Sequence, residues 1–243
     1  MKPSRLAWLL VSCACPTLLQ AQSGIQILSQ SYSINATWQD GGSSRGTPAP
    51  VAGGYNLSSS NGSPVSASSG SASGRVTASA SIDLFAVYQS AIASDGYDGD
   101  WNYIWGRAQQ TVQADWLFCP IVDSLDFTIN ASKSATPSSM TSSGFTLTLS
   151  DVTDATVLLN FDTAQNGNGL EADYTYAVNP SDIYKFSISG WANTFPNNGW
   201  ESFSHNINAS ITSVPEPTTA LLLLSALAGL AGCKVMSRSR ISN

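Results

Sequence analysis

Apolar and polar residues alternate along much of this chain, and this period of two limits the fold more than any other feature of the sequence. In the clearest case, Phe145, Leu147 and Leu149 alternate with Thr146 and Thr148. Successive side chains of a β-strand point to opposite faces, so such a segment forms a strand with one apolar face. The same alternation occurs at residues 125–130, 184–189 and 203–211.

Turn-forming clusters rich in Gly, Asn, Asp, Ser and Pro separate these segments. They lie at residues 95–100, 165–169, 179–182 and 196–199. Further strands are predicted at residues 24–38, 76–91, 101–118, 157–161 and 172–178. Strands with one apolar face bury that face by packing sheet on sheet. We therefore predict an all-β domain over residues 22–213, a jelly-roll-like β-sandwich of two antiparallel sheets.

One internal stretch departs from this pattern. Residues 41–74 are dominated by Ser, Gly, Ala and Pro, and their only large apolar side chains are Val51, Tyr55, Leu57 and Val65. Such a segment buries too little apolar surface to offset the entropy lost when it becomes ordered. We expect a mobile loop here, with a Ser/Thr-rich glycan attachment region as the alternative.

The beginning of the chain has the composition of an export signal. Two cationic residues precede an apolar run over residues 6–19, and Ala21 supplies the small residue at a cleavage point. We predict a signal peptide over residues 1–21. The alternative is lipoprotein processing, in which Cys13 would be lipidated and become the first residue. Either way the chain is exported.

A second signal occupies residues 214–243. No charged side chain occurs between Ala220 and Gly232, and a basic cluster follows. An uncharged apolar stretch followed by cations is typical of a membrane stop whose basic end stays in the cytoplasm. Counted over residues 218–236, the segment reaches the roughly 17–25 residues that a span requires. The motif before it is Val214, Pro215, Glu216 and Pro217, and the cations after it are Lys234, Arg238 and Arg240.

This order of parts resembles the PEP-CTERM sorting signal of bacterial proteins, in which a Pro-Glu-Pro triplet precedes an apolar segment and a basic end. The triplet here is Pro215, Glu216 and Pro217. The resemblance implies export by the secretion machinery, a stay in the inner membrane, and processing by an exosortase near the triplet. It covers only the last thirty or so residues and implies nothing about the activity of the rest. An ordinary C-terminal anchor is the alternative.

Charge and cysteine content exclude two classes of function for residues 22–213. This span carries fifteen carboxylates, and its five basic side chains are Arg45, Arg75, Arg107, Lys133 and Lys185. An acidic surface repels phosphate backbones, so nucleic acid is excluded as a partner. Cys119 is the only cysteine of the span, so no disulfide can form within it. Its apolar neighbours predict a buried side chain rather than a reactive thiol.

An acidic loop is the candidate metal site. Asp95, Asp98 and Asp100 lie within six residues that also contain two glycines. Carboxylates gathered by a tight turn can bind a hard cation such as Ca²⁺, although the spacing is not that of an EF-hand. Solvated turn residues are the alternative, and a strand-end turn explains Asp151 and Asp154 in the same way.

Catalytic groups are sparse, and we predict that the protein is not an enzyme. His205 is the only histidine and lies in phase with Phe203 and Ile207, which predicts an inward-facing side chain. No G-x-S-x-G nucleophile elbow accompanies it. A glycosidase needs two carboxylates about 5–10 Å apart. Glu171 and Glu201 are the only glutamates before the sorting triplet, and no acidic pair stands out.

Exposed tryptophans are the candidate carbohydrate-binding residues. Trp101 and Trp200 follow turn clusters, and Trp191 lies near another. The flat indole ring stacks on the faces of sugars, whereas packing within the sheets is the alternative use of a large aromatic side chain.

Taken together, the sequence predicts an exported, exosortase-processed cell-surface or extracellular-matrix protein. A structural or adhesive role in an exopolysaccharide or biofilm context follows by association with the PEP-CTERM resemblance. The first alternative is a carbohydrate-binding module that uses surface Trp and Ca²⁺. The second is a secreted polysaccharide hydrolase.

Overall fold

The structure is a computed structural model that describes residues 24–42, 50–97, 103–135, 142–194 and 199–214. The predicted signal peptide, the triplet Pro215–Pro217, the apolar segment 218–236 and the basic cluster at its end all lie outside the described residues. Within those described ranges, no helix is long and apolar enough to cross a membrane.

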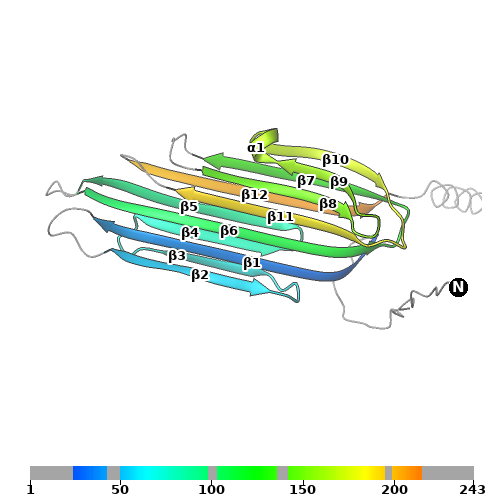
Figure 1. Ribbon diagram of the computed structural model, residues 1–243, viewed down its shortest axis with the longest axis horizontal. Coiled ribbons are helices and arrows are strands. Elements are labelled where there is room, and N and C mark those ends of the chain that lie inside the picture. Colours follow the sequence, from blue (N-terminus) through cyan, green and yellow to red (C-terminus); the bar gives the residue numbers. More distant parts are fainter. Residues whose placement is uncertain (1–23, 43–49, 98–102, 136–141, 195–198, 215–243) are drawn as a thin grey trace, which may run out of the picture.

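The described chain is almost entirely β-strand, as the alternation predicts, and its strands run along the long axis of the molecule (Figure 1). A short helix, α1 (Thr163–Asn166), follows the ninth strand. The strands are β1 (Ile25–Gly42), β2 (Val51–Ser59), β3 (Val65–Gly70), β4 (Val76–Asp83), β5 (Ala86–Tyr97), β6 (Tyr103–Pro120), β7 (Ser124–Ala135), β8 (Ser142–Asp151), β9 (Thr156–Asp162), β10 (Gly169–Ala177), β11 (Tyr184–Thr194) and β12 (Trp200–Ser213).

All twelve strands belong to one continuous antiparallel sheet with two halves. Half A has the order β2-β1-β6-β11-β8-β9. Half B has the order β3-β4-β5-β12-β7-β10. The halves join where Asp95–Tyr97 of β5 pair with Tyr103–Trp105 of β6. The all-β class is therefore confirmed, but the predicted pair of separate sheets is replaced by a continuous sheet, because β5 and β6 are long enough to keep pairing beyond half B.

The inner faces of the two halves share an apolar core. Trp116 of β6 and Phe186 of β11 stack at 5.7 Å between ring centroids, and Phe85, from the turn between β4 and β5, lies 5.1 Å from Trp116. Phe127 of β7 approaches Phe186 at 6.5 Å. Each of these side chains is at most 1 % exposed, and full burial of one large apolar side chain contributes about 1.5–3 kcal/mol. These aromatic contacts tie half A to half B.

The mobile loop predicted over residues 41–74 is wrong for most of its length. β2 pairs with β1 from Val51 to Ser59, and β3 pairs with β4 from Val65 to Gly70. Both strands add to the edge of a half that other strands already form, so their backbone hydrogen bonds and partial burial oppose the entropic cost. Residues 43–49 lie outside the described part.

Both ends of the described chain lie at the same end of the molecule, which we call the terminal end. Ile25 pairs with Pro120, and a Cβ added to Gly24 would lie 2.8 Å from Cβ of Ser213. The backbone N–H of Val214 donates to the carbonyl of Ser124 at 3.2 Å. The β5–β6 junction lies at the opposite end, which we call the corner end.

Candidate functional site

The outer face of half A carries a continuous set of polar side chains toward the corner end. Strand alternation turns Asn35, Thr37 and Gln39 of β1 to solvent while their neighbours enter the core. Strand β6 turns Gln109 and Thr111 outward in the same way. We call the outward set the polar face; its residues are Asn35, Thr37, Gln39, Arg107, Gln109, Thr111, Trp191 and Asn193.

The register of the sheet places these residues in rows across the strands. Thr37 lies opposite Gln109, which in turn lies opposite Asn193. In the adjacent row, Thr111 lies between Asn35 and Trp191. Neighbouring strands are about 4.8 Å apart, so each row presents polar groups at that regular spacing. The face is therefore a regular array of hydroxyl and amide groups with an indole ring at one side.

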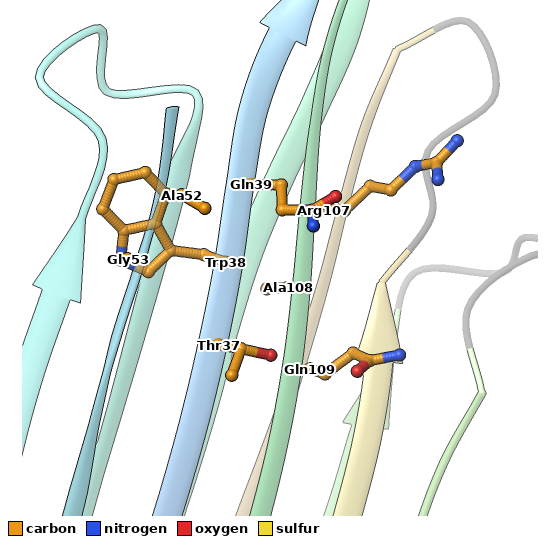
Figure 2. Close-up of a pocket in the computed structure, with 8 residues that line it drawn as sticks. All are labelled: Thr37, Trp38, Gln39, Ala52, Gly53, Arg107, Ala108 and Gln109. Carbon is orange, nitrogen blue, oxygen red and sulfur yellow. The ribbon is translucent and has the colours of Figure 1, made fainter. Parts of the chain in front are cut away.

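A groove of about 660 Å³ opens on this region, where β1, β2 and β6 meet. Figure 2 shows Thr37, Arg107 and Gln109 pointing away from the ring of Trp38, which lies toward Ala52 and Gly53 of β2. The volume falls within the range of about 300–1,000 Å³ that is common for ligand pockets. The guanidinium of Arg107 also lies 4.8 Å from the ring centroid of Trp105, a cation–π contact.

The polar face differs in hydrogen bonding from the rest of the same surface. Nearer the terminal end, Asp115 accepts from Ser187 at 2.6 Å and pairs with Lys185 at 3.0 Å. The side chains of Thr37, Gln39 and Gln109 instead face solvent. Exposed amides offer both donors and acceptors, and a hydroxyl group offers one of each. This arrangement suits a ligand that presents many hydroxyl groups.

The three predicted tryptophans do not form one site. Trp191 is 41 % exposed on the outer face of half A, where its ring lies against Gly144. Trp200 is 64 % exposed at the start of β12 and faces outward from half B. Trp101 lies outside the described residues. Only Trp191 belongs to the polar face, and the polar residues around it were missed. Residues 107–113 lie in a predicted strand, so a period of two along them could have identified the outward-facing polar side chains of that strand.

The acidic loop is described only in part. Asp95 belongs to β5, and its Oδ1 accepts a hydrogen bond from the backbone N–H of Gly199 at 2.6 Å, which fastens the start of β12 to the corner end. Asp98 and Asp100 lie outside the described residues. A Ca²⁺ site at these three residues therefore stays a prediction.

His205 faces inward, as its phase predicts, and is fully buried. Its Nδ1 lies 3.1 Å from Oε1 of Gln89 on the neighbouring strand. Burial lowers the pKa of His205 to about 4, and the positive charge of Lys133 contributes in the same direction. An imidazole enclosed in this way cannot reach a substrate in solution.

The remaining candidate residues lie apart. Glu171 is exposed on β10 opposite Asn130, whereas Glu201 is buried near the start of β12. Asn130 also pairs with Asn208, seven positions beyond Glu201, so the structure does not bring the two glutamates together. Cys119 is half-buried on β6 rather than fully buried.

A comparison with known protein families identifies the C-terminal segment of the chain. Residues 213–240 match the PEP-CTERM protein-sorting motif. The chain carries a PEP-CTERM sorting signal. This signal starts where the last strand ends. Strand β12 ends at Ser213, and the backbone N–H of Val214 still donates a hydrogen bond to the carbonyl of Ser124. A PEP-CTERM signal indicates an exported protein with a membrane-anchored intermediate that an exosortase processes.

The other comparisons add no argument about the domain. No curated protein matches this chain. Two solved structures, of the Gx and Gt strains of infectious bursal disease virus, are similar over 80 % of this chain at 13 % and 11 % identity. Their TM-scores are 0.17 and 0.18, and the chain spans 63 % of the length of each. A similarity this weak supports no conclusion about the fold or the function of this chain.

Proposed function

We propose that this protein is a non-catalytic structural or adhesive component of the cell surface or extracellular matrix, and that it contacts exopolysaccharide through the polar face. The PEP-CTERM signal supports the route by which it reaches that place. The polar face supports the contact. Secretion machinery and exosortase act on the chain in transit, and polysaccharide is its partner afterwards.

One observation carries the polysaccharide contact: a row of solvent-facing hydroxyl and amide side chains lies beside an exposed indole ring. Thr37, Gln109 and Asn193 lie in one row, and Trp191 ends the next. A sugar ring offers apolar C–H faces that stack on an indole and equatorial hydroxyl groups that bond to amides. A groove or flat face open at its ends accepts a long polymer.

The charge of the domain favours a neutral polysaccharide over an acidic one. Fifteen carboxylates against five basic side chains give residues 22–213 a strongly negative field. This field repels a polyanion at low ionic strength. We therefore expect tighter binding to neutral chains than to uronic-acid chains, with a gap that narrows as salt is added.

The test compares two exposed tryptophans in the same protein. Trp191→Ala removes the ring beside the polar face, and Trp200→Ala removes a more exposed ring from the other half. We expect Trp191→Ala to weaken binding to the neutral exopolysaccharide of the producing cells by about tenfold, equivalent to about 1.4 kcal/mol. The control Trp200→Ala keeps the affinity of the parent, as measured by affinity electrophoresis.

Two results contradict the proposal. Equal loss in both tryptophan variants places the contact elsewhere, and no binding to any polysaccharide removes it. The size of the polysaccharide is followed in the same samples, because shortening of the polymer by the parent protein contradicts the non-catalytic role.

A further inference from the structure

The two long edges of the molecule differ in charge. Strands β9 and β10 lie along one long edge, and β2 and β3 lie along the opposite edge (Figure 1). The first edge carries carboxylates: Asp162 ends β9, and Glu171 and Asp173 are exposed on β10. The second edge has none, because no charged residue occurs between Arg45 and Arg75. A domain that is strongly acidic elsewhere therefore has one uncharged edge.

Strand β2 has a free side along its whole length. Among the described strands it pairs with β1 alone. Each of its residues is exposed or half-buried, and none is buried. The free side of an edge strand presents backbone N–H and C=O groups that can pair with another chain, and natural sheets usually block such an edge with charge, proline or a bulge. Strand β2 contains no charged residue, no proline and no bulge.

The neighbouring edge strand does not block the approach either. Strand β3 lies beside β2 at the edge of the other half, where Trp38 of β1 reaches across to donate to Ser69. Strand β3 is also free of charge and of proline. The equivalent approach at the opposite edge would bring Glu171 and Asp173 of two molecules together, and like charges on paired strands repel. Charge therefore favours the edge formed by β2 and β3 as a place of contact between two acidic molecules.

We propose that β2 pairs antiparallel with β2 of a second copy of this chain, so that half A of both copies forms one sheet. A contact of this kind is isologous, which means that the same surface is used on both sides. The side chains of β2 are self-complementary in this arrangement. Pairing centred on Tyr55 places Leu57 opposite Gly53 of the second copy. It also places Asn56 opposite Gly54, so a larger side chain meets a glycine at both positions.

Backbone hydrogen bonds and burial stabilise this pair, and the charge of the domain opposes it. Tyr55 and Leu57 are half-buried, and a second copy covers them further. One strand pair buries less than the roughly 1,200–2,000 Å² of a stable interface, so the association depends on protein concentration. Added salt screens the repulsion between two acidic domains. The pair therefore strengthens as ionic strength rises, which is the opposite of an association held by ion pairs.

The pairing has two geometric consequences. Its two-fold axis is perpendicular to the sheet, so the polar faces of both copies lie on the same side of the pair. The two β2 strands run in opposite directions, so the two terminal ends lie at opposite ends of the pair. The pairing goes beyond the polysaccharide contact and does not depend on it, because the backbone of β2 makes it in the absence of any polymer.

The first test adds the same charge to either edge of half A. Asn56→Asp places a carboxylate on an exposed position of β2, and the matched control Asn160→Asp places one on an exposed position of β9. Sedimentation velocity follows protein purified from the producing cells, free of polysaccharide, over a range of protein and NaCl concentrations. We expect the parent to become dimeric as both rise. Asn56→Asp should raise the Kd of the dimer about tenfold, whereas Asn160→Asp leaves it unchanged.

Urea unfolding shows whether each variant keeps the fold. Both side chains are exposed, so we expect both variants to unfold at the same urea concentration as the parent. A parent that stays monomeric at every protein and salt concentration overturns the pairing. An equal change of Kd in the two folded variants also overturns it, because the added charge then acts without regard to the edge.

The second test measures the register by cross-linking. Ser58 lies opposite Ala52 of the second copy when the pair is centred on Tyr55. A mixture of Ser58→Cys and Ala52→Cys chains should therefore cross-link through a short bismaleimide. Either variant alone should give only the background of the native cysteines, because its two introduced thiols lie about 20 Å apart along the strands. Equal cross-linking in the mixed and separate samples overturns the proposed pairing.

Discussion

His205 is the residue whose environment most clearly sets a property of the whole domain. It lies inside the core between Phe145 and Phe203, with ring centroids 5.6 and 5.5 Å away. Its Nε2 and Nε2 of Gln89 have no hydrogen-bond partner among the described atoms. A neutral imidazole tolerates this position, whereas an imidazolium would be a buried charge beside Lys133.

We therefore expect the free energy of unfolding to decrease as the pH is lowered through a defined range. The pKa of His205 is about 4 in the folded protein and 6.5 as the ordinary value, so the unfolded chain binds more protons between these limits. The free energy of unfolding then decreases as pH falls from 6.5 to 4, and this residue contributes no slope above 6.5. At about 1.36 kcal/mol per pH unit, the loss is about 3 kcal/mol.

Urea unfolding of the parent and of His205→Gln at several pH values measures this contribution. Carboxylates also titrate at acid pH, so the difference between the two proteins isolates the imidazole. Parallel curves for the two proteins contradict the prediction.

At the scale of single residues, the position of a side chain can be predicted from the sequence where one pattern determines it. The inward position of His205 follows from its phase with Phe203 alone. The carboxylate oxygens of Asp182 and Asp151 lie within 4.8 Å of each other. This proximity cannot be predicted from the sequence, because the separation of the two residues along the chain carries no information about the path of β9 and β10. Trp191 and Trp200 looked alike in sequence, and only the assignment of their strands to different halves separates them.

At the scale of elements, β2 shows how a weakly apolar segment is held. Gly53 lies opposite Trp38, and the indole Nε1 of Trp38 donates to Oγ of Ser69 on β3 at 2.9 Å. A Cβ at Gly53 would lie 2.5 Å from the Trp38 ring. The absence of a side chain at Gly53 therefore permits Trp38 to pack between β2 and β3.

Gly53→Ala should displace the Trp38 ring and break its bond to Ser69. We expect a loss of about 1–3 kcal/mol, typical of overpacking. The control Ala52→Val, on the exposed side of the same strand, should change stability by no more than about 0.5 kcal/mol. Urea unfolding followed by tryptophan fluorescence measures both, and equal stability of Gly53→Ala and the parent contradicts the packing argument.

The strands with large apolar residues were predicted closely, and the misses have physical reasons. Residues 76–91 were expected as one strand but form β4 and β5, because the turn at Leu84–Phe85 contains none of the usual turn residues and Phe85 takes a φ of 54°. β2 and β3 were missed because their stability comes from the strands they join. The composition of residues 41–74 alone does not reveal the backbone hydrogen bonds that β2 and β3 make to β1 and β4.

At the scale of the whole molecule, processing is the event that changes the protein most. We expect the protein from the producing cells to begin at Gln22 and to end near Pro217, as measured by intact mass. Glu216→Ala should leave the chain uncut in the membrane fraction, whereas Glu171→Ala, an exposed glutamate on β10, is processed as in the parent. A parent whose mass extends to Asn243 contradicts exosortase processing.

Gly24 and Ser213 are neighbours at the terminal end, where the sorting signal begins, and the groove lies farther along the strands toward the corner end. Thr37 is twelve residues along β1 from Ile25, so at 3.3–3.4 Å per residue the groove lies about 40 Å from the terminal end. That distance is about the full thickness of a membrane with its headgroups. A polymer bound in the groove would therefore be held that far from the point where the sorting signal begins.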